Sequence, residues 1–281
     1  MLDGDHAAPV FQVSREGEAL PVGQLFALEP SNFALVLESS PSQPKYFQGM
    51  PSFLEDVRPK GFFGAGFSRR HKDLGLPEKL KDWSLQDTLK AILTRGEDLP
   101  GNLLIGKGSH GRYQESLAAP LPYTEEASAA VHYVALAKAA TENEPAGAPL
   151  GGNSPKFSAL LGRGNHKKNV FVKFAPPAKN KNDELRRDLL LCQQLALIAL
   201  EEEGILVAGG RILEEQGFTF LEMERFDRTG ERGRIRMLSF GSLGAPRLSK
   251  PTSWSILAGL LEKEGKDRKS TRLNSSHVKR S

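Results

Sequence analysis

The sequence has very little cysteine, no long apolar run and no excess of one charge over most of its length. Its single cysteine, Cys192, excludes an internal disulfide, and because it lies in the apolar segment 189–200 we expect it to be a small buried core residue. No apolar stretch approaches the roughly 20 residues that a membrane-spanning helix needs, and residues 1–10 lack the pattern of a signal peptide. These features predict a globular, cytoplasmic protein with no membrane partner.

The formal net charge of +4 is confined to the end of the sequence. Five of the 38 basic residues but only one of the 34 acidic residues lie within 267–281, so the rest carries 33 charges of each sign. A neutral body lacks the basic footprint of a nucleic-acid-binding domain, so we expect no direct nucleic-acid binding. The segment 267–277, DRKSTRLNSSH, resembles translated sequencing-adapter DNA. We therefore expect 267–281 to be non-native and the parent protein to continue past residue 266.

The first region follows a disordered start at 1–8 and spans 9–122. Alternation of apolar and polar residues around a Glu-Gly turn predicts a hairpin over 9–28, and short apolar runs predict strands near 33–37, 45–47 and 102–105. Ser52 and Ser84 each precede an acidic first turn, so we expect each to cap a helix; the second helix should end at Gly96. The pattern predicts a mixed α/β subdomain.

The second region contains a helix and linker at 123–150 and then a sheet at 151–266. Thr124, followed by two glutamates, predicts the N-cap of a helix reaching residue 140. Beyond the linker we expect two strands joined by a hairpin, a helix over 183–203, strands at 210–213, 218–223 and 234–238, and a helix from about Ser253. The predicted class is α+β, in which a curled antiparallel sheet carries one main helix, as in a kinase N-lobe.

A glycine turn followed by a strand lysine marks the candidate site. Residues 151–156, GGNSPK, lead into a predicted hairpin whose second strand carries Lys173 among apolar residues. Glycine lets backbone N–H groups approach phosphate oxygens closely, and a lysine supplies a charge that bridges them. The six histidines show no metal-ligand spacing, so we predict no metal site within the chain.

Several spaced motifs resemble the HipA family, the serine/threonine protein kinase toxins of type II toxin–antitoxin pairs. They are GGNSPKF at 151–157, VKFAPP at 172–177, RDLL at 187–190 and MERFDR at 223–228. FLEDVRP at 53–59 and GEDLPGN at 96–102 resemble the amino-terminal region of a HipA-like subgroup that carries a helix-turn-helix ahead of it. The resemblance covers roughly residues 9–266, with the kinase C-lobe missing.

The resemblance implies ATP with Mg²⁺ as cofactors of the intact parent and assigns a role to each matching residue. Lys173 would bridge the α- and β-phosphates, and backbone groups of Glu224 and Phe226 would meet the adenine. Arg225, Asp227 and Arg228 would form the ionic scaffold of the hinge. The phosphate-facing loop would consist of Gly151, Gly152, Asn153, Ser154, Pro155 and Lys156.

The sequence departs from the family pattern at several positions. Pro149 replaces an autophosphorylated serine, Ser154 replaces a loop glutamine, and Gln193 stands where a glutamate usually pairs with the lysine. No Asp-x-His-x-x-Asn motif occurs, so the catalytic base and the Mg²⁺-binding aspartate are missing. We therefore expect a kinase fragment that is inactive by itself. Its parent would phosphorylate a protein hydroxyl, with aminoacyl-tRNA synthetases as one substrate class. The alternative is a non-catalytic module that binds an antitoxin or a DNA-bound partner.

Overall fold

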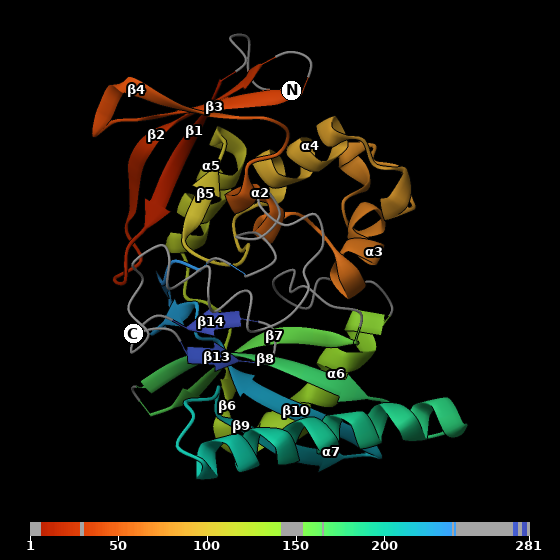
Figure 1. Ribbon diagram of the computed structural model, residues 1–281. Helices are drawn as coiled ribbons and strands as arrows, with labels where there is room; N and C mark the ends of the chain where they lie inside the picture. Colours follow the sequence, from red (N-terminus) through yellow and green to blue (C-terminus); the bar gives the residue numbers. More distant parts are fainter. Residues whose placement is uncertain are drawn as a thin grey trace.

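Two β-sheets, each packed against helices, make up this computed structural model (Figure 1). The structure describes residues 7–28, 31–141, 154–164, 166–237, 239, 272–274 and 277–279. The mixed α/β class predicted from the sequence is confirmed. Among the described helices, none combines the length and apolar character needed to cross a bilayer.

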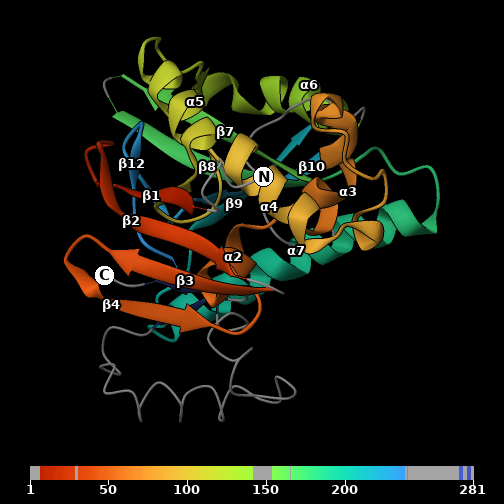
Figure 2. The same cartoon turned by 90° about the horizontal axis from the view of Figure 1, so that it is seen from above.

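The first sheet is antiparallel throughout, with its strands in the order β4-β3-β2-β1-β5. Figure 2 shows β2, β3 and β4 side by side from above. The predicted hairpin is present, and its turn is held by the Ser14 hydroxyl, which accepts from the N–H groups of Glu16 and Glu18 at 3.1 and 3.2 Å. Its first strand already begins at Ala7, so the expected disordered start at 1–8 is two residues too long. The strands are β1 (Ala7–Val13), β2 (Ala19–Leu28), β3 (Asn32–Leu37), β4 (Ser40–Phe47) and β5 (Leu103–Ile105).

Helices of the first region bury the apolar side chains of this sheet. Ser84 caps its helix as predicted, because its hydroxyl accepts from the Asp87 N–H at 3.1 Å while the Asp87 carboxylate accepts from the Ser84 N–H at 2.8 Å. Ser52 does not cap its helix: the N-cap is Pro51, and Ser52 is the first helical residue. The helices are α2 (Ser52–Val57), α3 (Gly61–Arg70), η1 (Lys72–Leu74), η2 (Leu80–Asp82), α4 (Leu85–Arg95) and α5 (Lys107–Leu117).

The second sheet has the order β6-β7-β8-β10-β9, and all its pairs are antiparallel except β6 with β7. Thr124 was expected to cap a helix, but it is extended and pairs with Leu161 of β7. The helix starts later, at Ala129, after a short 3-10 turn. The strands are β6 (Thr124–Glu125), β7 (Lys156–Arg163), β8 (His166–Ala175), β9 (Gly210–Glu215) and β10 (Phe218–Glu224).

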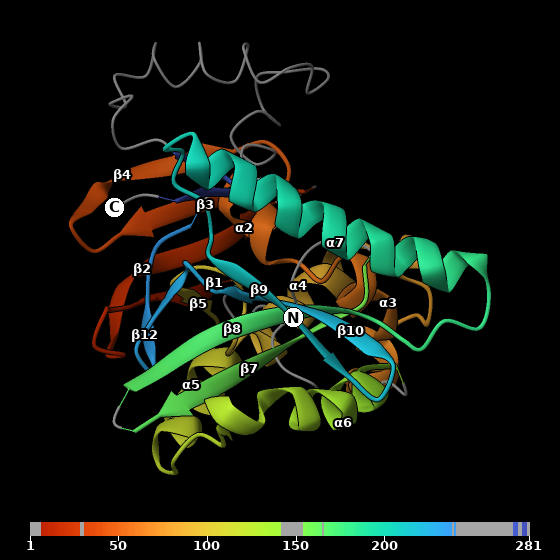
Figure 3. The ribbon, with the colours of Figure 1, turned by 90° about the horizontal axis from the view of Figure 1, so that it is seen from below.

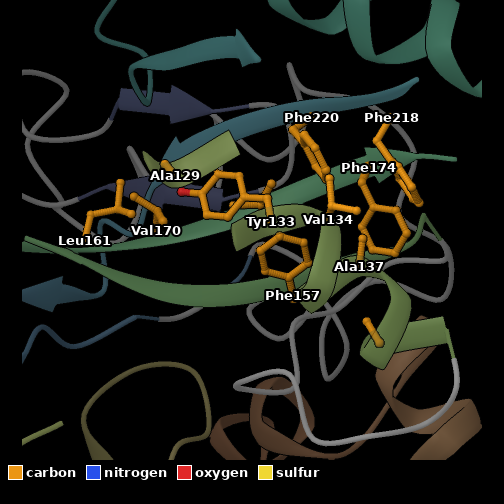
Figure 4. Packing of buried hydrophobic residues seen from close by; sticks show 12 residues of the cluster. Ala129, Tyr133, Val134, Ala137, Phe157, Leu161, Val170, Phe174, Phe218 and Phe220 are labelled. Carbon is orange, nitrogen blue, oxygen red and sulfur yellow. The ribbon is translucent and has the colours of Figure 1, made fainter. Parts of the chain in front are cut away.

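Helices cover both faces of this sheet, and both were predicted, one reaching residue 140 and one over 183–203. Cys192 on the second helix is exposed, so the prediction that it is a buried core residue is wrong. Figure 3 shows α7 (Lys181–Glu202) on one side and α6 (Ala129–Thr141) on the other. The 3-10 helix η3 (Glu126–Ser128) precedes α6. Tyr133 of α6 packs edge-on against Phe157 and Phe220, with ring centroids 5.3 and 5.6 Å away (Figure 4). The Asn180 side chain caps α7 by accepting from the Asp183 N–H at 3.2 Å.

Beyond the second sheet the chain returns to the first region. The short strands β11 (Arg228–Thr229) and β12 (Gly233–Arg234) pair, so only residue 234 of the strand expected over 234–238 is in a strand, and residues 235–237 are not. In the 267–281 segment, which was expected to be non-native, β13 (Arg272–Asn274) pairs with β14 (His277–Lys279). Leu238 and the helix expected from Ser253 lie outside the described residues.

Candidate functional site

Two lysines lie opposite each other on the face of the second sheet that packs against α7. Lys173 of β8 is the cross-strand partner of Lys156 of β7, so both side chains leave the same face of the sheet. The Lys173 ammonium donates a hydrogen bond to the Gln193 amide oxygen of α7 at 2.7 Å. The Gln193 amide nitrogen in turn lies 3.4 Å from the Met223 sulfur of β10. Strands β7, β8 and β10 and helix α7 therefore each contribute a side chain to this site.

Alternation along β8 explains why Lys173 is on this face. Phe171 and Ala175 pack into the cluster under α7, whereas Val170, Val172 and Phe174 pack into the cluster under α6. Side chains two residues apart share a face of a strand, so Lys173 points toward α7. An ammonium in this apolar cluster needs a polar partner, and Gln193 supplies one.

Burial makes both ammonium groups costly to charge. Lys156 is only 3% exposed, and its burial, together with the charge of Lys173, lowers its pKa to about 8. Burial also lowers the pKa of Lys173. A phosphate group would offset both effects, because its charge favours the protonated form of each amine. This donor set thus fits a polyphosphate anion.

The amino-terminal side of the site differs in part from the predicted loop. Lys156 was expected to end a phosphate-facing loop, but it is the first residue of β7 and is buried. The Pro155 carbonyl accepts from the Phe174 N–H at 3.1 Å, which ties the segment before β7 to β8. Ser154 precedes it and is exposed. The predicted loop residues Gly151, Gly152 and Asn153 lie outside the described residues.

The predicted hinge residues lie where β10 leaves the sheet. Glu224 ends β10, is exposed, and is three residues beyond Leu221, the cross-strand partner of Lys173, which corresponds to about 10 Å along the strand. The Arg225 N–H donates to the Asn169 carbonyl at 2.9 Å, and Phe226 follows with a half-buried side chain. These residues therefore adjoin the lysine pair along one strand.

A buried ionic cluster connects this exit to the first region. Asp227 accepts from Arg225 at 3.0 and 2.9 Å and from Arg228 at 2.6 Å, and Arg228 also donates to Asp98 at 2.7 Å. The Gly101 N–H donates to Asp227 at 3.0 Å. Burial alone would raise the pKa of Asp227, but the two guanidinium groups hold it well below its usual value. The ionic cluster predicted for Arg225, Asp227 and Arg228 is thus present, and it also includes Asp98, a residue of the 96–102 motif to which no role was assigned.

Arg234 is a second feature that sequence reasoning missed. Its guanidinium lies over the Tyr113 ring, 5.0 Å from the centroid, and donates to the Glu97 carbonyl. Burial, followed by the charge of Arg228, lowers its pKa to about 9. Among the described residues, no group of three or more histidine, cysteine or acidic side chains could hold a metal ion.

Comparison with known proteins finds a protein-family model that matches the amino-terminal part of this chain. Residues 4–114 match the family model described as "YjjJ-like toxin, middle domain". That match stops before the two lysines, so it bears on the first region. The motif-based prediction of a toxin family agrees with it.

One curated protein is similar in sequence over most of this chain. The chain is 29% identical over 254 residues to "Toxin YjjJ" of Escherichia coli (strain K12), which covers 89% of this chain and 56% of that protein. The chain thus spans about half the length of the curated relative it matches. Among solved structures, one from Shewanella oneidensis MR-1 is described as a toxin–antitoxin system of HipA, HipB and operator DNA. It is 18% identical with a TM-score of 0.47, covering 83% of this chain and 55% of that one.

Proposed function

We propose that this chain holds the nucleotide-binding half of a HipA-like serine/threonine protein kinase toxin. The observation that carries the proposal is the Lys173–Gln193 hydrogen bond of 2.7 Å, with Lys156 directly opposite on β7. A buried and a half-buried cation on one face of a sheet are costly to keep charged, which is typical of sites built for an anion. The matches to toxins support the choice of family.

Each residue has a defined part in this proposal. Lys173, oriented by Gln193, bridges the α- and β-phosphates of ATP, and Lys156 adds a second charge on the same face. Backbone groups of Glu224 and Phe226 meet the adenine at the exit of β10. Bound Mg²⁺ would neutralise phosphate charge in the complete enzyme.

The complete protein would transfer the γ-phosphate of ATP to a protein hydroxyl. This chain contains no Asp-x-His-x-x-Asn motif, so it lacks a base to accept the hydroxyl proton. We therefore propose that it binds nucleotide without transferring phosphate. An antitoxin protein as partner, an aminoacyl-tRNA synthetase as substrate and the cytoplasm as location complete the proposal.

Calorimetric titration of the 281-residue chain with ATP tests this function. Lys173→Met removes one charged contact to phosphate, worth about 1.5–3 kcal/mol, so ATP should bind roughly 10- to 150-fold more weakly. Lys179→Met is the matched control, because Lys179 is exposed and lies just before α7. Circular dichroism checks that both variants are folded.

The same titration can contradict the proposal. Equal ATP affinity in Lys173→Met and Lys179→Met would exclude the lysine pair as the site. No ATP binding by the folded wild-type chain would favour a non-catalytic binding module. Phosphate transfer by the wild-type chain would show that the missing motif is not required.

A further inference from the structure

The ammonium group of Lys173 is held by an uncharged partner. It donates to the Gln193 amide oxygen at 2.7 Å, and the Gln193 amide nitrogen donates in turn to the Met223 sulfur at 3.4 Å. An amide has one accepting end and one donating end, so it satisfies both contacts at once. A carboxylate has two accepting oxygens and would turn one of them toward the sulfur without a donor. Glutamine therefore fits this position, and it orients Lys173 without neutralising the charge.

The strands around Lys173 bring no acidic side chain close to its ammonium. Strands β7 and β8 contain no aspartate or glutamate. Glu222 and Glu224 of β10 are one and three residues from Leu221, the cross-strand partner of Lys173, so alternation places them on the opposite face of the sheet. Glu214 of β9 is exposed and lies two strands away, which corresponds to roughly 10 Å.

Helix α7 likewise supplies no carboxylate to this lysine. Asp188 is exposed and pairs with Arg187 at 3.3 Å. The other acidic residues of α7 are at least eight positions from Gln193, which corresponds to about 12 Å along the helix. Burial lowers the pKa of Lys173, and no carboxylate among the described residues opposes this effect. The charge of Lys173 is thus left for a ligand.

A divalent cation at this site would add to the positive charge instead of offsetting it. Proteins hold Mg²⁺ through carboxylate oxygens in addition to the oxygens of the phosphates. In the part of the chain that the structure describes, no group of three or more histidine, cysteine or acidic side chains could hold a metal. The described residues therefore do not fit Mg²⁺, and its ligands in the complete enzyme would have to lie outside them.

We propose that this site takes ATP without a divalent cation, and that Gln193 sets this preference by leaving the charge of Lys173 to the phosphates. The inference rests on the nucleotide site proposed above and adds the ionic form of the ligand and the residue that selects it. Lys156 and Lys173 lie opposite each other on neighbouring strands, so their charges repel. The most negative ligand relieves this repulsion best. Mg²⁺ cancels part of the phosphate charge, so metal-free ATP is favoured over its Mg²⁺ complex.

Calorimetric titration of the 281-residue chain with ATP in two buffers measures this preference. One buffer contains EDTA and the other contains excess MgCl₂, and both have the same ionic strength because salt screens charges. We expect the wild-type chain to bind metal-free ATP about tenfold more tightly than the Mg²⁺ complex, which is the effect of one additional charged contact. The measured quantity is the ratio of the two dissociation constants.

Three variants separate the charge at position 193 from the shape of the side chain. Gln193→Glu neutralises Lys173 and should abolish the preference for metal-free ATP. Gln193→Met removes the hydrogen bond without adding a charge, so it should weaken ATP binding in both buffers and keep the preference. Leu195→Glu is the matched control, because it adds the same charge on the opposite side of α7, where Leu195 is 65% exposed, and it should keep the wild-type ratio. Each ratio compares a variant with itself, so a smaller folded fraction does not change it.

The possible outcomes distinguish this inference from the nucleotide site on which it rests. A wild-type chain that binds the Mg²⁺ complex as tightly as metal-free ATP, or more tightly, would keep the nucleotide site and overturn the inference. A preference that Gln193→Glu leaves unchanged would overturn the role of Gln193, and so would an equal loss of preference in Leu195→Glu. No binding of ATP to the folded chain in either buffer would refute the nucleotide site itself, and the inference with it.

Discussion

Replacing Lys156 with methionine should stabilise the fold and weaken nucleotide binding at the same time. Lys156 is 3% exposed, and its pKa is lowered from 10.5 to about 8, first by burial and then by the charge of Lys173. Each pKa unit corresponds to about 1.36 kcal/mol, so the charged side chain costs roughly 3 kcal/mol of stability at neutral pH. Methionine has a similar volume and no charge, so the substitution removes this cost without opening a cavity.

The lowered pKa of Lys156 also predicts how the free energy of unfolding depends on pH. Between pH 8 and 10.5 the unfolded chain still holds a proton on Lys156 that the folded chain has released. The free energy of unfolding therefore rises with pH across that window, and the destabilisation is fully present below pH 8. Arg234, whose pKa is lowered to about 9, adds to this rise only above about pH 9. The difference between wild type and Lys156→Met isolates the part due to Lys156.

Urea denaturation at pH 7 and at pH 10.5 is the assay. We expect Lys156→Met to be about 3 kcal/mol more stable than wild type at pH 7, equivalent to a melting temperature roughly 6–12 °C higher, and to lose most of this advantage at pH 10.5. ATP should raise the melting temperature of wild type and not that of the variant. A less stable variant, or an advantage independent of pH, would refute the reasoning.

Three further substitutions test other parts of the structure. Gln193→Glu places a carboxylate beside the Lys173 ammonium and should raise the Lys173 pKa, which an NMR titration of the lysine would detect; an unchanged pKa would contradict the observed geometry. Asp227→Asn leaves two buried arginines without their counter-charge and should cost about 3–5 kcal/mol in urea denaturation, whereas the exposed Asp188→Asn should change stability by about 0.5 kcal/mol or less. Phe157→Ala empties the aromatic cluster under α6 and should cost about 3–5 kcal/mol; a loss below about 1 kcal/mol would mean that the cluster does not hold the sheet.

Local sequence signals predicted the elements that local interactions define. The Ser84 capping box, the Gly96 stop and the alternating hairpin over 9–28 depend on residues close in sequence. The helices α3 and α5 were missed because they contain glycines, which lower helix propensity. They depend on distant contacts instead: Ser109 of α5 accepts from the Gly96 N–H at 2.7 Å.

The start of α6 shows the same limit. Thr124 followed by two glutamates is a normal helix start, so the sequence favoured a cap there. Pairing with Leu161 of β7, 37 positions later in the chain, holds Thr124 extended instead. Tertiary pairing overrode a local preference, and no local signal indicated it.

The parts of the candidate site that lie in recognisable sequence motifs were predictable. Lys173 and Gln193 lie in contact as the motif spacing implied. The burial of Lys156 was not predictable, because it depends on register with β8, which the sequence does not specify. Asp98 joins the ionic cluster through Arg228, and Arg234 lies over the Tyr113 ring; both contacts join residues that are far apart in the sequence. Each is an ordinary charged residue in its own sequence context.

The central claim is that the Lys156–Lys173 pair binds the phosphates of ATP. Its most direct test is labelling with an acyl-phosphate derivative of ATP, which transfers its acyl group to a lysine amine beside the phosphates, followed by mass spectrometry of the peptides. Both lysines have lowered pKa values, so a neutral amine is available to react. The account predicts labelling of Lys156 or Lys173 that excess ATP prevents. Labelling spread over exposed lysines such as Lys179, with no protection by ATP, would contradict it.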